Sequence, residues 1–237
     1  GVFHMKSYII DNNLILSGAN LSQEYFCDRQ DRYFHVYGGK LVEFYADLVK
    51  ILSSRADQYP ASGTRALKED FVASMAELFA PSTYTTDDDV TAYAIPTLQQ
   101  PNLMLPFTSD VEQIKNLLDA TAEEGCSVKL ASAYLNPTQS FISSLQKQNA
   151  CELLTAGPTS HGFAPKPGVK RRGDFVPSYF VANCLDLKEK HGLSVKWYNR
   201  LGWTFHAKGL WVISPAGRLV AAVVGSGNFG YRSEQRD

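Results

Sequence analysis

The sequence predicts an α/β protein with the size of one large domain or two small ones. Short apolar runs of strand length alternate along the chain with longer segments in which apolar residues recur at helical spacing. The 237 residues are 44% hydrophobic and 20% charged, which is enough apolar material to bury a core. Strands that alternate with helices are typical of an α/β layered sandwich.

The first part of the chain is predicted to begin with a hairpin that is followed by two helices. The turn residues Asp11-Asn12-Asn13 separate two apolar runs. Residues 82–106 contain three aspartates and three prolines, so we expect a connecting segment there. The predicted elements of this part are strands at 2–10 and 14–16 and helices at 40–57 and 64–80.

A second unit is predicted to follow the connecting segment. Ser109 to Glu112 fits a capping box for a helix that should end at Gly125. Asn136-Pro137 is a typical helix start, and a loop rich in Gly and Pro over 156–177 precedes a helix that should end at Gly192. The predicted strands of this part are 128–135, 151–155, 193–197, 203–213 and 219–224.

Composition excludes several classes of function. The 23 basic and 24 acidic residues nearly balance, so no global basic field attracts nucleic acid and any phosphate site must be local. The four cysteines are scattered, which favours reduced thiols over disulfides or a structural zinc. No apolar run approaches the roughly 20 residues that span a bilayer, so we expect any membrane contact to be peripheral. The chain begins at Gly1 rather than at a methionine, and we expect a fragment.

One pattern occurs near both ends of the chain. The first copy is His4-x-Lys6, then Asp11, then Ser17-Gly18-Ala19-Asn20. The second copy is His206-x-Lys208, then Gly225-Ser226-Gly227-Asn228. Each asparagine is followed by a stretch that contains aromatic residues, Arg and Asp, over 25–31 and 231–237. Two copies in the same order make a chance match improbable.

These residue types suit a phosphate. Side chains at positions i and i+2 of a strand point to the same face, so each His and Lys are predicted to project together from a strand. A glycine turn brings backbone N–H groups close to an anion, and an asparagine adds another donor. Two such half-sites would surround one phosphorus with two imidazoles and two ammonium groups. One His would then attack while the other protonates the leaving oxygen, with no metal and no cofactor.

The pattern resembles the phospholipase D superfamily. His4-x-Lys6-x4-Asp11 matches the superfamily's H-x-K-x4-D motif, and His206-x-Lys208 resembles its second copy, with Ile213 where an aspartate would complete it. The flanking blocks are similar to those of eukaryotic phosphatidylglycerophosphate synthases; they span 11–22, 28–33, 202–211 and 228–233.

The resemblance implies a fold of two phospholipase D-like repeats, each a β-sheet flanked by helices, packed about a pseudo-twofold axis. Residues 1–105 would hold the C-terminal part of the first repeat and the connecting segment. Residues 106–237 would hold the second repeat, truncated at its C-terminus.

The resemblance also implies an activity. A phosphatidyl group would pass from CDP-diacylglycerol to sn-glycerol 3-phosphate through a phosphohistidine, at a peripheral membrane surface, on the mitochondrial inner membrane. His4 is assigned as the nucleophile by family habit, although the residues allow the reverse. The implied catalytic residues are His4, Lys6, Asp11, His206 and Lys208. The implied phosphate-binding residues are Asn20, Ser226 and Asn228.

Other interpretations stay open at this point. A phosphatidylserine synthase would share the His–Lys pairs, and a phospholipase D-type phosphodiesterase would pass the intermediate to water. A lipid-binding module with a relic site is a third alternative. Among the remaining histidines, His35 and His191 are interpreted as structural. His161 lies in the loop rich in Gly and Pro, where it could contact substrate.

Overall fold

The computed structural model describes residues 4–56, 69–80, 92–98, 110–164 and 175–235. Within these ranges the chain forms two units, and each is described by itself. One unit comprises the described parts of 1–6, 16–34 and 114–237, and the other those of 7–15 and 35–113. The predicted boundary between residues 105 and 106 separates two sequence repeats. The two units are defined by packing instead and do not test that boundary, which stays a prediction.

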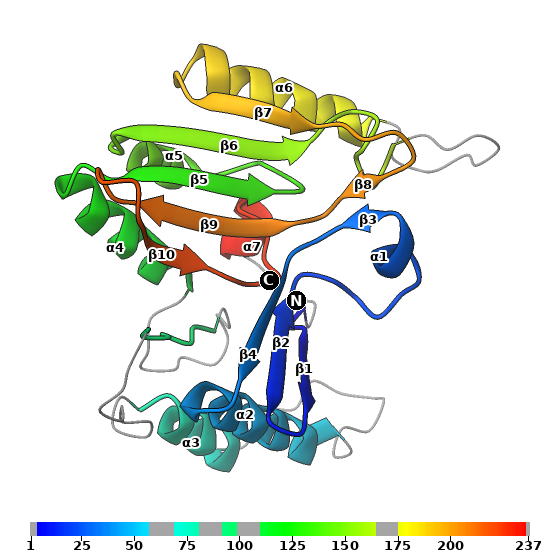
Figure 1. Cartoon of the computed structure of the whole chain (residues 1–237), viewed down its shortest axis with the longest axis vertical. Helices are drawn as coiled ribbons and strands as arrows, with labels where there is room; N and C mark the ends of the chain where they lie inside the picture. Colours follow the sequence, from blue (N-terminus) through cyan, green and yellow to red (C-terminus); the bar gives the residue numbers. More distant parts are fainter. Residues whose placement is uncertain (1–3, 57–68, 81–91, 99–109, 165–174, 236–237) are drawn as a thin grey trace. The chain divides into compact units, whose positions relative to one another are not determined.

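A five-stranded sheet forms the centre of the first unit (Figure 1). Strands β5, β6 and β7 are parallel, whereas β9 runs antiparallel to both β5 and β10. The strands are, in sheet order, β10 (Leu219–Val223), β9 (Lys208–Ile213), β5 (Ser127–Ser132), β6 (Ala150–Ala156) and β7 (Ser194–Tyr198). The α/β class predicted from the sequence is therefore confirmed.

The strand predicted over 203–213 is divided in two. Thr204–Phe205 forms β8, which leaves the large sheet and pairs in parallel with β3, Arg29–Gln30. The amide of His206 donates to the carbonyl oxygen of Gln30 at 2.7 Å, so regular pairing with β5 resumes only at Lys208. The prediction that His206 lies on a strand is therefore wrong, because its backbone is bonded to a different segment.

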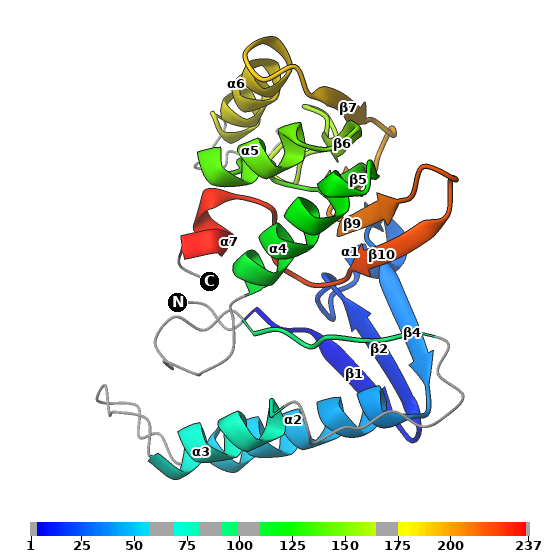
Figure 2. The ribbon, with the colours of Figure 1, turned by 90° about the vertical axis from the view of Figure 1, so that its left-hand side faces the viewer.

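Helices α4 (Asp110–Glu123), α5 (Gln139–Gln146) and α6 (Val176–Glu189) cover one face of this sheet (Figure 2). Gly125, with φ +69°, follows α4 as predicted, whereas the proposed capping residue Ser109 lies outside the described residues. The N-cap of α5 is Thr138 rather than Asn136, because its hydroxyl accepts from the amide of Phe141 at 3.4 Å.

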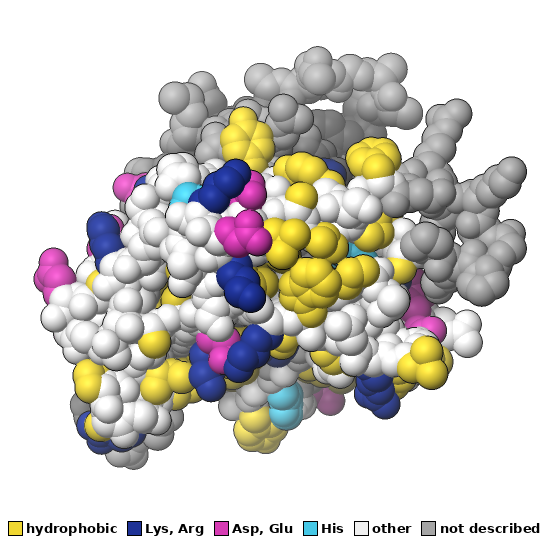
Figure 3. Space-filling view, turned by 90° about the horizontal axis from the view of Figure 1, so that it is seen from above, with side chains coloured by type: hydrophobic (Ala, Val, Ile, Leu, Met, Phe, Trp, Pro, Cys, Tyr) yellow, Lys and Arg dark blue, Asp and Glu magenta, His cyan; other side chains and the backbone are white. Residues whose placement is uncertain are grey.

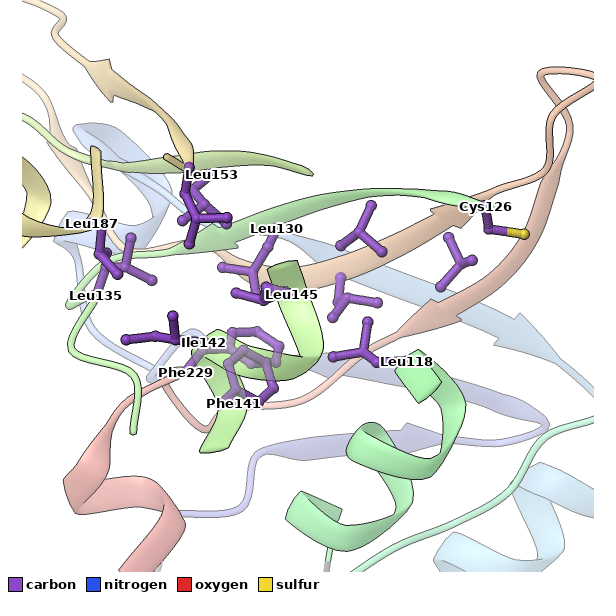
Figure 4. Packing of buried hydrophobic residues seen from close by; sticks show 14 residues of the cluster. Leu118, Cys126, Leu130, Leu135, Phe141, Ile142, Leu145, Leu153, Leu187 and Phe229 are labelled. Carbon is purple, nitrogen blue, oxygen red and sulfur yellow. The ribbon is translucent and has the colours of Figure 1, made fainter. Parts of the chain in front are cut away.

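The core of this unit lies between the helices and the sheet (Figure 4). Leu130 of β5 and Leu210 of β9 are register partners, and each is at most 1% exposed. Leu118 of α4 and Leu145 of α5, which are fully buried, pack over them. Truncating such a leucine to alanine costs about 2–5 kcal/mol. This packing fixes β5, which ends at the candidate site, and β9, which begins there.

The second unit contains two helices and most of a three-stranded sheet, of which residues 16–17 and 33–34 are counted with the first unit. Its strand order is β1-β2-β4, with β1 at Ser7–Ile10, β2 at Asn13–Ser17 and β4 at Tyr33–Tyr37. Helix α2 spans Lys40–Ala56 and α3 spans Glu69–Leu78, which confirms both predicted helices over their described residues. The predicted hairpin is also confirmed, but β1 begins only at Ser7, so His4 and Lys6 precede the strand rather than lie on it.

Two short helices complete the described chain, α1 at Glu24–Cys27 and α7 at Tyr231–Gln235. Within the described ranges, no helix combines the length and the apolar character needed to cross a bilayer.

Candidate active site

The second His–Lys pair lies at the carboxyl edge of the large sheet. Lys208 is the first residue of β9 and pairs with Ser132, the last residue of β5. Lys208 therefore lies level with the carboxyl end of β5, and His206, two positions earlier, lies just beyond it. Ligands of open α/β sheets bind at this edge.

The short ladder between β3 and β8 brings Asp31 to His206. Arg29 pairs with Thr204 and Gln30 pairs with Phe205. The next residues along each strand are then neighbours, and the Oδ2 of Asp31 lies 2.7 Å from the Nδ1 of His206. The side chain of Asp31 is fully buried, and that of His206 is 12% exposed.

This contact decides where the proton of the His206 ring lies. Nδ1 is also 2.7 Å from the Nζ of Lys208, but one nitrogen cannot both donate to Asp31 and accept from Lys208. A carboxylate only accepts, so the pairing that satisfies all three groups places the proton on Nδ1. Lys208 instead donates to the carbonyl oxygen of His206. The second ring nitrogen, Nε2, is then the one available for proton transfer to a ligand.

Two tyrosines hold the His206 ring edge-on. Tyr25 meets it at 5.2 Å between centroids with an interplanar angle of 82°, and its hydroxyl lies 3.3 and 3.4 Å from the two ring nitrogens. Tyr134 meets it at 6.3 Å and 80°. Burial raises the pKa of both tyrosines, so both are neutral phenols near pH 7. Together they restrict the orientation of the imidazole.

Burial lowers the pKa of His206, and Asp31 counteracts this by stabilising the imidazolium. Lys208 and Arg29 lower the pKa of His206 further through their positive charges. A histidine whose pKa is moved by opposing charges at the edge of a sheet is typical of an acid–base residue. These neighbours, rather than solvent, therefore control its protonation.

Lys6 and Lys208 share the surroundings of Asp31. The pKa of Lys208 is lowered to about 7, chiefly by burial; Asp31 acts to raise it, and the charges of Lys6 and Arg29 act to lower it. The pKa of Lys6 is also lowered by burial and raised by Asp31. Lysines from the two copies of the motif thus interact electrostatically with the same carboxylate, that of Asp31. Each ammonium also donates to the carbonyl oxygen of the histidine two positions before it, His4 at 2.8 Å in the first copy.

Gly18 of the first copy faces this cluster at close range. A Cβ at this position would lie 3.1 Å from the Cδ of Lys208 and 3.2 Å from the Oδ1 of Asp31. Both contacts are tighter than most real Cβ contacts, so Lys208 or Asp31 would have to shift by a few tenths of an ångström. The glycine predicted to bring the backbone close to an anion is therefore also closely packed against Lys208 and Asp31.

Arg32 fixes Asp31 from the other side. Its amide donates to the Oδ1 of Asp31 at 2.8 Å, and its carbonyl oxygen accepts from the hydroxyl of Ser17 at 2.7 Å. Its guanidinium lies 4.4 Å from the ring centroid of Trp211 and donates to the carbonyl oxygen of Val223 at 3.0 Å. Asp31 is therefore anchored to β9 and β10 independently of His206.

The remaining predicted residues lie in loops. Asp11 is exposed at the turn between β1 and β2, in the left-handed region with φ 50°. Asn20 is exposed, and Ser226 is half-buried after β10. The Oδ1 of Asn228 is buried and has no hydrogen-bond partner among the described residues. Their roles at a phosphate, and those of both histidines, stay predictions.

The other histidines differ in their surroundings. His161 is 2% exposed, burial lowers its pKa to about 4, and its Nδ1 accepts from the amide of Phe163 at 3.2 Å. Its ring also packs against Tyr134 at 4.9 Å. His35 interacts with Asn13 at 2.9 Å at the surface.

Sequence reasoning missed Asp31, Tyr25, Tyr134 and Arg29 as parts of the site. A signal for Asp31, Tyr25 and Arg29 was present, because the stretch 25–31 follows Asn20 as 231–237 follows Asn228. Tyr134 has no comparable signal, since only the fold places it beside His206.

Comparison with known proteins gives whole-chain relatives. A protein from Homo sapiens named CDP-diacylglycerol–glycerol-3-phosphate 3-phosphatidyltransferase, mitochondrial, is 30% identical and aligns with 100% of this chain and 50% of its own length. A protein from Saccharomyces cerevisiae named CDP-diacylglycerol–glycerol-3-phosphate 3-phosphatidyltransferase is 24% identical over 90% of this chain and 48% of its own. No family model matches the chain.

The chain thus spans about half the length of these relatives. A solved structure, phosphatidylserine synthase from Haemophilus influenzae, has a TM-score of 0.59 and 18% identity over 88% of this chain and 51% of its own. That likeness concerns the fold. The relatives confirm the resemblance predicted from the two His–Lys motifs.

Proposed function

We propose that this chain forms the catalytic part of a phosphatidyltransferase. It would move the phosphatidyl group of CDP-diacylglycerol to the primary hydroxyl of sn-glycerol 3-phosphate, with release of CMP and formation of phosphatidylglycerophosphate. The observation that carries the proposal is the convergence of Lys6, Lys208 and His206 on the buried carboxylate of Asp31. Relatives across the whole chain bear the name of this activity.

The reaction has two steps. In the first, an imidazole nitrogen of His4 attacks the lipid-side phosphorus, the P–O bond to CMP breaks, and His206 gives its Nε2 proton to the departing oxygen. In the second, His206 takes the proton of the glycerol 3-phosphate hydroxyl as that oxygen attacks the phosphorus. The N–P bond to His4 then breaks, which restores both histidines.

The neighbouring groups serve these steps. Asp31 holds Nδ1–H, so His206 keeps Nε2 toward the reacting oxygens and its imidazolium is stabilised. Lys6 and Lys208 would neutralise the non-bridging oxygens, where charge develops in the transition state. Asn20, Ser226 and Asn228 would add hydrogen bonds to the same oxygens, and Asp11 would brace the first half-site.

The finer architecture belongs to the same proposal. Two phospholipase D-like repeats, within 1–105 and 106–237, would be related by a pseudo-twofold axis. The matching lysine-to-histidine-carbonyl bonds in both copies support this relation. The axis would place His4 and His206 about 6–7 Å apart, with one phosphorus between them.

The setting follows from the substrate. We place the enzyme at the surface of the mitochondrial inner membrane, since CDP-diacylglycerol is a lipid and the relative from Homo sapiens is named mitochondrial. The enzyme would bind this membrane peripherally and would not act on nucleic acid.

An acceptor experiment tests the proposal. The complete polypeptide receives labelled CDP-diacylglycerol in detergent micelles together with glycerol 3-phosphate, serine or water alone, and His206→Ala serves as the inactive control. Label should appear in phosphatidylglycerophosphate only with glycerol 3-phosphate. Transfer to serine would instead identify a phosphatidylserine synthase, and release of phosphatidic acid in water a phosphodiesterase. If the phosphatidyl group is transferred to none of the acceptors, the interpretation as a lipid-binding module would be favoured.

A further inference from the structure

A group of exposed apolar side chains lies beside the candidate site. We define it as the apolar rim, made of Phe163, Phe175, Tyr179 and Leu201. Their exposed fractions are 41%, 74%, 49% and 102%, respectively. Figure 3 looks onto the side of the large sheet formed by β7 and α6, where hydrophobic side chains form a patch bordered by charged ones.

Aromatic contacts join the rim to His206. Tyr134, which meets the His206 ring at 6.3 Å, also contacts Phe163 at 5.7 Å and Phe180 at 5.6 Å. Phe180 in turn contacts Tyr179 at 5.4 Å. The rim is therefore the outer end of a continuous aromatic path that begins at the candidate catalytic histidine.

Backbone contacts fix the rest of the rim to the same place. The hydroxyl of Ser160 accepts from the amide of Arg200 at 3.1 Å, and the carbonyl oxygen of Ser160 accepts from Phe205 at 2.8 Å. The loop with Phe163 is thereby tied to the turn that carries Leu201. The amide of Tyr179 donates to the carbonyl oxygen of Phe175 at 3.0 Å, so these two lie one helical turn apart.

The turn also carries an amphipathic pair. The guanidinium of Arg200 lies 3.7 Å from the ring centroid of Trp203. Tryptophan and arginine favour the zone between the acyl chains and the headgroups of a bilayer, where one end of the side chain is apolar and the other meets water or phosphate. Leu201, the fully exposed residue between them, is positioned to enter the acyl region.

We propose that the apolar rim is the surface by which this protein docks on a phospholipid membrane. The inference rests on the proposed function: a diacylglycerol phosphorus lies next to its acyl chains, so the surface around His206 must reach the interface. Leu201 is five residues from His206, at most about 18 Å along the chain. Insertion of the rim would bring the site to the phosphates without a membrane-spanning helix.

The test compares two double variants in the complete polypeptide. Phe175→Ser/Leu201→Ser removes two side chains of the rim. Leu219→Ser/Val220→Ser removes two apolar side chains that are 61% and 52% exposed on β10, at the opposite edge of the same sheet. Flotation measures binding to vesicles of phosphatidylcholine and phosphatidylglycerol. Turnover is measured with CDP-diacylglycerol in those vesicles and with a water-soluble short-chain analogue.

The rim variant should lose at least tenfold in vesicle binding and in turnover of the vesicle substrate, and keep turnover of the short-chain analogue within twofold. The β10 variant should match the wild type in all three. Unchanged vesicle binding of the rim variant would overturn the inference, as would equal loss in both variants. So would a rim variant that releases a bound protein partner but still floats with vesicles. Wild-type protein that binds vesicles through the rim but turns over neither substrate would defeat only the proposed function.

Discussion

Asp31 Oδ2 and His206 Nδ1 lie 2.7 Å apart although 175 positions separate the two residues in the sequence. A two-stranded parallel ladder creates this relationship, and the carboxylate it buries has no solvent-exposed side-chain surface. Its second oxygen accepts from the amide of Arg32 at 2.8 Å. Asp31 is thus a positioning residue: it orients an imidazole and stabilises its charged form.

Asp31→Asn should reduce kcat by about 100-fold or more, the scale of a misplaced acid–base group. Asp31 raises the pKa of His206, so its loss lowers that pKa. The first step needs the imidazolium, hence the fall of kcat on the alkaline side should move to lower pH. A pH profile of kcat measures this. Asp28→Asn, an exposed neighbour, should keep both rate and profile, and an unshifted profile in Asp31→Asn would remove the assigned role.

Lys208→Met should abolish turnover and stabilise the fold. Burial lowers the pKa of Lys208 to about 7, below its unfolded value of 10.5. At pH 7 and below, the folded state carries the full penalty of a buried charge; as pH rises toward 10.5 the penalty disappears. The variant should therefore melt above the wild type by about 4 °C near pH 7, with the gap narrowing toward pH 10.

The control for this variant is Lys129→Met, an exposed lysine of β5. It should leave Tm and turnover unchanged. Thermal melts across pH 6–10 give the comparison. A Lys208→Met protein that melts below the wild type at pH 7 would show that its charge stabilises the folded site.

Gly18→Ala should lower kcat/KM by at least tenfold. The added methyl group would press on Lys208 and Asp31, and hydrogen bonds to His206 and Arg32 prevent these from moving freely. Overpacking of this kind costs about 1–3 kcal/mol. Gly225→Ala is the matched control from the second copy, because nothing lies within 4 Å of its added Cβ. Equal activity of both variants would show that the first turn tolerates a side chain.

Hydrophobic pattern predicted the elements that pack against the core. The apolar residues of β5 and β9 form short runs of strand length that contribute to the buried clusters, and those of α2 follow a helical period. The helices α1 and α7 and the strand β3, which have two to five residues each, show no clear period and were not predicted.

The candidate site divides in the same way. The His–Lys pairs were visible because the chain repeats them. The partnership of Asp31 with His206 depends on a non-local ladder, which no local pattern specifies. The same ladder explains why His206 lies before β9 instead of on it, since its amide is bonded to Gln30. The sequence was thus sufficient to identify His206 and Lys208 as candidate site residues, whereas the contact of His206 with Asp31 could be found only in the folded structure.

A trapping experiment separates the roles of the two histidines. The complete polypeptide is mixed with CDP-diacylglycerol labelled in the lipid phosphate and is quenched within one turnover under conditions that preserve phosphohistidine. Wild-type protein should retain label through a bond to nitrogen. His4→Ala should retain none, because it lacks the nucleophile.

His206→Ala keeps the nucleophile but lacks the acid, so label should accumulate at least 100-fold more slowly. A donor with a leaving group of low pKa, which needs no protonation, should restore much of that first step in His206→Ala and none of it in His4→Ala. His35→Ala, at the surface beside Asn13, is the control and should label at the wild-type rate. Label that persists in His4→Ala and disappears in His206→Ala would exchange the two roles. Turnover without label in any variant would favour direct attack of glycerol 3-phosphate on the lipid phosphorus.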